Sequence, residues 1–156
     1  WRFACARYCR LRRMSSEVAA APAPEPALQV SGVHHVAIIA SDYVRSRRFY
    51  TEVLGLRVVH EVFRAERQSY KLDLQLPDGT QVEIFSFPHP PARPSYPEAC
   101  GLRHLALGVA DMEASVGALV AHGVAVEPVR VDPFTGALFT FFADPDGLPI
   151  ELVGPA

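Results

Sequence analysis

From residue 33 onward, hydrophobic and polar positions form short runs that predict a strand, a helix and three further strands. Residues 33–39 are rich in β-branched side chains, as expected of a strand. Asp42 then stands at a helix N-cap position, and the helix that follows should end at Gly55. Three more strands are predicted at 56–64, 70–76 and 80–87, with Asp78-Gly79 as the turn between the last two.

The same order of elements starts again at residue 102. Residues 102–107 predict a strand, Asp111 an N-cap, and Gly123 the end of a second helix. Further strands are predicted near 124–131, 138–143 and 149–153, with Asp146-Gly147 as another turn. The segment between the halves, residues 88–101, contains five prolines, which are excluded from helix interiors and strand ladders. It is therefore predicted to be a linker.

Matching spacings in the two halves indicate an internal repeat. His35 precedes Asp42 by seven residues, and His104 precedes Asp111 by seven. Similarly, 48 residues separate His35 from Glu83 and 47 separate His104 from Glu151. Chance rarely places one His and one Glu at equivalent points of both copies. Two copies are too few for a solenoid, so the pattern predicts two βαβββ units joined edge to edge.

Side-chain alternation along the predicted strands places these four residues on the polar faces of their sheets. Successive side chains of a strand point to opposite faces of the sheet. His35 therefore lies opposite Val36 and Ile38, and Glu83 lies opposite Val82 and Ile84; His104 and Glu151 have equivalent apolar neighbours. In the third strand, Lys71, Asp73 and Gln75 share the polar face, while Leu72, Leu74 and Leu76 should face the helices.

The combination of two His and two Glu predicts a metal site. A carboxylate on a concave sheet surface is costly to bury unless it is paired or bound to a metal. The four residues His35, Glu83, His104 and Glu151 suit a divalent ion such as Zn, Ni, Co, Mn or Fe. Taken singly, each is more often packed or solvated, but their common register favours the metal site. His34, His60, His89 and His122 lack counterparts across the repeat and are assigned structural or surface roles.

Composition and charge exclude several classes of function. The formal net charge is −2, and five arginines lie in residues 1–13, which leaves 10 basic against 17 acidic residues in the remainder. A body this acidic is unsuited to nucleic acid, whose phosphates require clustered Lys and Arg. No run approaches the roughly 18 apolar residues of a membrane helix. Three cysteines, Cys5, Cys9 and Cys100, indicate no disulfide framework, so a reducing, cytoplasmic compartment is expected.

The first 32 residues differ in composition from the rest of the chain. Residues 1–13 are rich in Arg and contain no acidic residue, and residues 15–31 are rich in Ala and Pro. We expect 1–32 to be a disordered extension and linker. The Arg-rich stretch has three readings of similar weight: part of an organelle transit peptide, upstream sequence translated in error, or the remains of a longer protein.

Five strings of sequence resemble the vicinal oxygen chelate (VOC) superfamily, which contains glyoxalase I, bleomycin-resistance proteins and extradiol dioxygenases. The resemblance covers about residues 33–153. It rests on His35-Val-Ala-Ile-Ile-Ala-Ser-Asp42, Phe49-Tyr50-Thr-Glu-Val-Leu-Gly55, Val82-Glu83, Leu102-Arg-His104-Leu-Ala-Leu and Asp144-Pro-Asp-Gly147-Leu-Pro-Ile-Glu151. It implies an α+β fold in which two tandem βαβββ modules form a partial barrel around a metal. The VOC domain would span 33–154, with repeat one at 33–87, the linker at 88–101 and repeat two at 102–154.

Among the branches of the superfamily, the His/Glu/His/Glu set resembles glyoxalase I. The resemblance implies a lactoylglutathione lyase-like enzyme that detoxifies methylglyoxal as its glutathione hemithioacetal, through metal-stabilised enediolate proton transfer. It further implies a zinc or nickel ion and a homodimer with sites at the subunit interface. By the same resemblance, Glu151 is the catalytic base and Glu83 its partner across the metal. The expected partner is thus a small molecule, with neither nucleic acid nor membrane involved.

Two positions depart from the glyoxalase I pattern. Ile39 stands where that branch commonly has an arginine that binds a glutathione carboxylate, and Phe87 stands where it commonly has an asparagine. An epimerase, a dioxygenase, a thiol transferase and a non-catalytic small-molecule or antibiotic-binding module therefore stay open as alternatives. An epimerase fits the ligand set and the missing glutathione contacts best. Five basic residues are candidates for an anion site instead, although surface roles are expected for most of them: Arg64, Arg67, Lys71, Arg93 and Arg130.

Overall fold

The computed structural model describes residues 28–156, of which 32–156 form one compact unit. The predicted disordered extension, residues 1–32, falls almost wholly outside the described residues. Within residues 28–156, no helix has both the length and the apolar character needed to cross a membrane.

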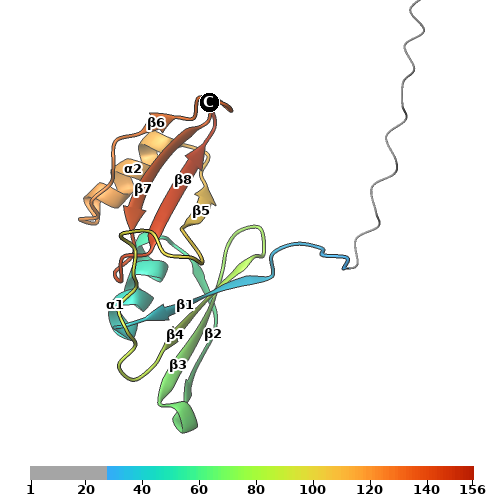
Figure 1. Cartoon of the computed structure of the whole chain (residues 1–156), viewed down its shortest axis with the longest axis vertical. Helices are drawn as coiled ribbons and strands as arrows, with labels where there is room; N and C mark the ends of the chain where they lie inside the picture. The colour runs from blue at the N-terminus through green and yellow to red at the C-terminus, as the bar shows by residue number, and fades with distance from the viewer. Residues whose placement is uncertain (1–27) are drawn as a thin grey trace, which may run out of the picture. The chain divides into compact units, whose positions relative to one another are not determined.

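The first module is a four-stranded sheet with a short helical segment on one face (Figure 1). Its elements are β1 (His35–Ala40), α1 (Tyr43–Arg48), the π-helical turn η1 (Phe49–Val53), β2 (Arg57–Arg64), the 3-10 turn η2 (Ala65–Arg67), β3 (Ser69–Gln75) and β4 (Gln81–Ser86). The strand order is β1-β4-β3-β2, in which β1 and β4 are parallel and the other pairs antiparallel. The chain therefore crosses from one sheet edge to the other through α1.

The second module repeats this topology. Its elements are β5 (Leu105–Gly108), α2 (Met112–Ala121), β6 (Arg130–Val131), β7 (Leu138–Ala143) and β8 (Pro149–Gly154). The order β5-β8-β7-β6, with β5 and β8 parallel, is equivalent to that of the first sheet. The predicted fold class of two βαβββ modules is thus confirmed.

One predicted element was wrong in extent. The strand expected near 124–131 is reduced to Arg130–Val131 and an isolated bridge between Val126 and Phe142. Pro128 lies between these two pairings and has no backbone N–H to donate to a ladder. The first helix does end at Gly55 as predicted, but its second part, Phe49–Val53, is π-helical.

The apolar faces of both sheets and the inner faces of the helices form one core. Leu72, Leu74 and Ile84 of the first sheet and Ile150 of the second are fully buried in it. The predicted alternation is confirmed, since Ile38 and Ala40 are buried while their neighbours His35, Ala37 and Ile39 are exposed. Polar side chains of β1 and β4 are thereby left on the opposite, concave face.

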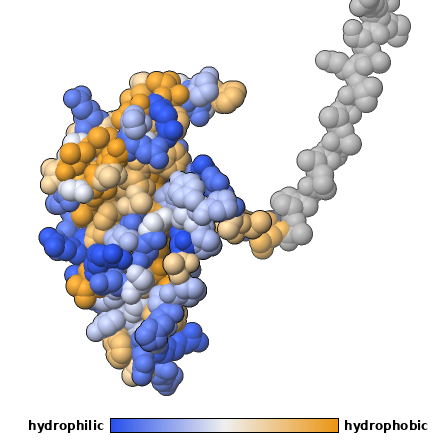
Figure 2. All heavy atoms as spheres, turned by 60° about the vertical axis from the view of Figure 1, so that its left-hand side comes forward, coloured by the Kyte–Doolittle hydropathy of each residue, from blue (hydrophilic) through white to orange (hydrophobic). Residues whose placement is uncertain are grey.

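Apolar side chains also reach the surface. Figure 2 shows hydrophobic patches among hydrophilic ones on one face of the molecule. The edge strand β2 is exposed along nearly its whole length and carries four exposed apolar residues: Val58, Val59, Val62 and Phe63. Natural proteins usually protect sheet edges and seldom expose contiguous apolar surface unless it binds something.

The Asp144-Pro145-Asp146 turn joins the two modules. Asp146 accepts hydrogen bonds from the backbone N–H of Ser41 at 2.9 Å and from Arg45 Nη2 at 3.0 Å. Asp144 accepts one from the buried Tyr50 hydroxyl at 3.0 Å. Residues of the second module thus bind the loop and helix that follow β1.

Asp111 caps α2 as predicted, since its Oδ1 accepts a hydrogen bond from the Ala114 N–H at 2.9 Å. We expect Asp111→Ala to lower the free energy of unfolding by about 1 kcal/mol, because one helix N–H loses its acceptor. Asp111→Ser should retain most of the stability. Urea unfolding of the three proteins measures this, and equal midpoints would show that the helix does not depend on its cap.

Candidate metal centre

The first His–Glu pair lies on the concave face of the first sheet. β1 and β4 are neighbours, and Glu83 is in register with Ala37, two residues from His35. His35 Nε2 lies 3.8 Å from Glu83 Oε2. The Glu83 side chain is 14% exposed and that of His35 43%. The pair is therefore close and reachable from solvent, as a metal half-site needs to be.

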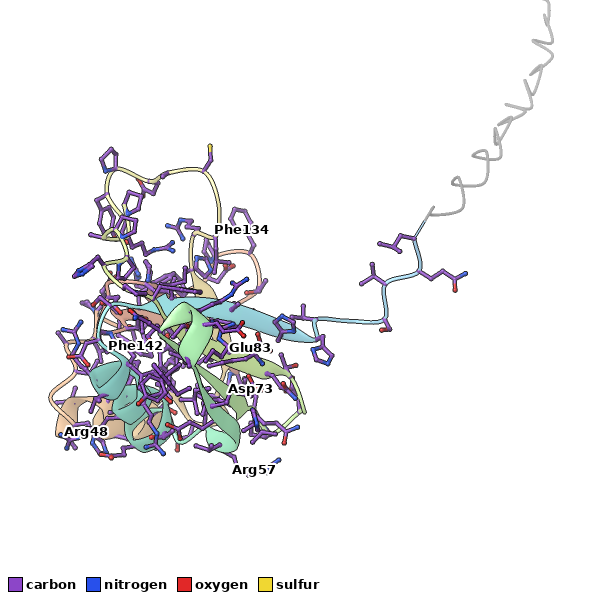
Figure 3. The ribbon with its side chains drawn as sticks, turned by 90° about the horizontal axis from the view of Figure 1, so that it is seen from below. Arg48, Arg57, Asp73, Glu83, Phe134 and Phe142 are labelled. Carbon is purple, nitrogen blue, oxygen red and sulfur yellow. The ribbon has the colours of Figure 1, made fainter. Side chains whose placement is uncertain are left out.

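A row of charged side chains continues from Glu83 across this face. Lys71 Nζ lies 2.9 Å from Glu83 Oε1 and 2.6 Å from Asp73 Oδ1. Asp73 is the cross-strand neighbour of Glu83, and the two lie close together in Figure 3. His60 Nδ1 lies 3.7 Å from Asp73 Oδ2. Burial disfavours the charge of Lys71, but its hydrogen bonds to Asp73 and Glu83 outweigh this and raise its pKa.

The second His–Glu pair lies on the concave face of the second sheet. Glu151 of β8 is in register with Ala106 of β5, and His104 immediately precedes β5. His104 Nε2 lies 2.9 Å from Glu151 Oε2. The other ring nitrogen, Nδ1, lies 3.0 Å from Arg103 Nη1. The His104 ring also packs edge-on against Phe141, which helps to fix its orientation.

A cavity of about 640 Å³ opens around the second pair. The concave face of β7 and β8 forms one wall, and residues 93–99 of the Pro-rich linker form another. Ser95 Oγ donates a hydrogen bond to the Gly147 carbonyl at 2.9 Å, and Arg93 donates to the Leu102 carbonyl. The linker between the repeats is therefore anchored as part of the pocket.

Each module assembles its own His–Glu pair, but one copy of the chain does not bring the pairs together. Within residues 28–156, no three His, Cys, Asp or Glu side chains are placed to hold a metal ion together. The four predicted ligands thus form two separate His–Glu pairs. Sequence reasoning missed the ion pair of Lys71 with Glu83, although alternation had placed both residues on one face.

Comparison with known proteins identifies the family. A sequence profile of the Glyoxalase/Bleomycin resistance protein/Dioxygenase superfamily matches residues 32–152. The chain belongs to this superfamily. The solved structure of SMU.1112c is 49% identical and superposes with a TM-score of 0.77, covering 80% of this chain and 99% of that one. The glyoxalase family protein from Enterococcus faecalis is 51% identical with a TM-score of 0.73, over 79% of this chain and 97% of that one.

The names of relatives within the superfamily describe different activities. Uncharacterized protein YaeR of Escherichia coli (strain K12) is 55% identical over 80% of this chain and 97% of its own length. The 2-epi-5-epi-valiolone epimerase of Actinomyces sp is 31% identical over 78% of both chains. The lactoylglutathione lyase of Haemophilus influenzae is 29% identical over 76% of this chain and 89% of its own. This superfamily member thus has both a lyase and an epimerase among its more distant relatives.

Proposed function

We propose that the protein is a metal-dependent, glyoxalase-I-like lyase or isomerase whose site is completed by two copies of the chain. His35 and Glu83 of one copy would share an ion with His104 and Glu151 of a second copy. The supporting observation is that each module forms its His–Glu pair, at 3.8 and 2.9 Å, while one copy leaves the pairs separate. The exposed apolar edge of β2 supports self-association.

The donor set fits a divalent ion. Two imidazoles and two carboxylates offer mixed N and O ligands, which suit zinc or nickel and also cobalt, manganese or iron. Both carboxylates are largely buried and already lie next to positive or polar groups, Glu83 beside Lys71 and Glu151 beside His104. A bound ion would hold two vicinal oxygens of the substrate and stabilise the negative charge left when a C–H proton departs.

The two carboxylates are held differently, which supports the assignment of Glu151 as the base. Lys71 holds Glu83 by a hydrogen bond of 2.9 Å, so Glu83 is restrained and its negative charge compensated. Glu151 has His104 as its neighbour and faces the 640 Å³ cavity. It can therefore approach a bound substrate, take a proton and return it to the adjacent carbon.

The hemithioacetal of methylglyoxal and glutathione is the leading substrate, supported by the lactoylglutathione lyase relatives. An epimerase acting beside a carbonyl group is the second candidate. The 31% identical epimerase favours it, as do Ile39 and Phe87 in place of glutathione-binding side chains. Ile39 is 55% exposed and lies in the same row as His35, so an apolar side chain borders the site.

Metal analysis combined with a hemithioacetal isomerisation assay tests this proposal. We expect the wild-type protein to bind about one ion per chain and to turn over the hemithioacetal. Glu151→Gln should lower turnover about 100-fold or more, the usual minimum for losing a positioned base, while the secondary structure stays unchanged. Glu113→Gln, an exposed glutamate in the first turn of α2 and outside the cavity, is the control and should keep normal turnover.

The outcomes separate the candidate functions. Stoichiometric metal without hemithioacetal turnover would favour the epimerase. Absence of bound metal after reconstitution with zinc, nickel, cobalt, manganese and iron would contradict the proposal and leave a non-catalytic binding module.

A further inference from the structure

Arg64, the last residue of β2, is a half-buried cation without an acidic partner among residues 28–156. Its Nη2 donates a hydrogen bond to the buried Ser69 Oγ at 2.7 Å. Its Nε is buried and has no hydrogen-bond acceptor. Buried polar groups normally have a partner, and an unpaired guanidinium group is costly to keep away from water. The residues that the structure describes therefore leave this guanidinium group incompletely hydrogen-bonded, and its Nη1, which is not buried, is the donor that a ligand can reach.

Two aromatic rings fix the position of this guanidinium group. Arg64 Cζ lies 4.8 Å from the centroid of the Phe85 ring and 5.7 Å from that of Phe87. The two rings are stacked, with their planes 13° apart. Lys71 Nζ lies on the same ring system, 5.9 Å from the Phe85 centroid. Cation–π contacts hold the guanidinium group in place and leave the Nη end of its edge for hydrogen bonding.

The aromatic rings place Arg64 beside the first half-site. Phe85 and Glu83 are two residues apart on β4 and share the concave face. Two residues of a strand span about 6–7 Å, so the guanidinium group lies a short carbon chain away from Glu83. A substrate whose oxygens are chelated near Glu83 can therefore reach Arg64 with a second functional group.

Charge balance indicates what that functional group is. On this face, Lys71 and Arg64 offset Asp73 and Glu83. A divalent ion and the Glu151 carboxylate from the second copy would leave the complete site with an excess of positive charge. An anionic substrate group would neutralise it.

We propose that Arg64 is a specificity-determining residue that binds a carboxylate on the substrate. The substrate class is then a compact anion, with two vicinal oxygens for the metal and a carboxylate a few carbons away, which favours the second candidate, the epimerase, over the glutathione hemithioacetal. This inference rests on the proposed metal site. The planar fork of an arginine matches the two oxygens of a carboxylate, and such charge-assisted hydrogen bonds are the stronger kind.

Matched pairs of hydroxamates test the inference, because a hydroxamate offers two vicinal oxygens to a metal. Succinic monohydroxamate is compared with butyrohydroxamate, and glutaric monohydroxamate with pentanohydroxamate, by calorimetric titration of the nickel-loaded protein. At one of these lengths, the wild-type protein should bind the carboxylate form about tenfold more tightly or better. In Arg64→Met this preference should fall to about twofold or less, with unchanged nickel content and unchanged affinity for the neutral hydroxamate.

Arg67→Met is the control, because Arg67 is an exposed arginine in the adjacent turn η2 and should leave the preference intact. Equal affinities within both pairs, or a preference that survives in Arg64→Met, would overturn the inference. If Arg64 only stabilised the β2–β3 turn through its hydrogen bond to Ser69, Arg64→Met would lower the free energy of unfolding without changing the preference for the carboxylate form.

A metal-free measurement separates this inference from the proposed function. The Nε–H signal of Arg64, assigned by its loss in Arg64→Met, is followed by NMR during titration with succinate and with the neutral butyramide. We expect a saturable shift with succinate only. If the protein binds no metal, the proposed function fails, and the succinate titration alone decides the anion site: a saturable shift supports it, and no shift overturns it.

Discussion

A heterodimer of two variants that each lack a different His–Glu pair should regain one metal site. His35→Ala/Glu83→Ala lacks the first half-site, and His104→Ala/Glu151→Ala lacks the second. Alone, each variant should lose stoichiometric metal. The loss of affinity should exceed the roughly 10–100-fold that removal of an outer-shell partner costs, because two direct ligands are missing. Co-expressed with different tags and purified through both, the two variants should form a heterodimer that binds about one ion.

The heterodimer should regain one site because each site would combine residues from both copies. If each site combines the first module of one copy with the second module of the other, the heterodimer has one site with both halves deleted and one with both intact. If one copy supplied all four ligands, both sites of the heterodimer would be damaged. Metal content of the doubly tagged protein, measured by elemental analysis, thus distinguishes the two arrangements.

A matched control uses two variants of the same module. His35→Ala and Glu83→Ala both damage the first half-site, so their heterodimer has no undamaged site and should stay as depleted as each variant alone. The proposal would be contradicted if the first heterodimer were equally depleted, or if monomeric wild-type protein held one ion per chain.

Much of the fold follows from the sequence because side-chain alternation in a sheet is strict. Once residues 35–40 and 81–86 are strands, the buried Ile38 and Ile84 fix the opposite orientation of His35 and Glu83. The repeated spacing then sets the equivalent pair in the second half. By contrast, the strand expected near 124–131 is shorter than predicted, because Pro128 removes a ladder donor within a valine-rich run.

The details of the site depend on side-chain conformation, which spacing does not encode. Alternation placed Lys71 and Asp73 on the same face as Glu83. It did not predict that Lys71 donates hydrogen bonds to Asp73 at 2.6 Å and to Glu83 at 2.9 Å. Arg64 was one of five basic candidates, and only the missing acceptor at its buried Nε distinguishes it. Asp144 carried no signal of burial, because an aspartate in an Asp-Pro-Asp-Gly turn is normally exposed.

Asp144 is nevertheless buried where the two modules meet. It is 6% exposed and accepts hydrogen bonds from the Tyr50 hydroxyl at 3.0 Å, the Asp146 N–H at 2.9 Å and the Leu148 N–H at 2.8 Å. Asp144→Ala leaves these donors without an acceptor and should lower the free energy of unfolding by about 2–4 kcal/mol. Asp78→Ala, in the exposed Asp78-Gly79 turn of the first repeat, should cost much less.

The pH dependence of Asp144→Asn tests whether the buried carboxylate opposes folding. Burial raises the pKa of Asp144 above its ordinary value of 3.8, although hydrogen bonds from Leu148 and Tyr50 oppose the rise. The folded protein therefore binds the Asp144 proton more tightly than the unfolded chain does. The resulting stabilisation is complete below the unfolded pKa and is lost as pH rises through the folded pKa. Asp144→Asn cannot ionise, so its stability relative to wild type should increase over that pH range. Urea unfolding at intervals from about pH 3 to 7 measures the difference, and a value independent of pH would show that burial does not disfavour the charge.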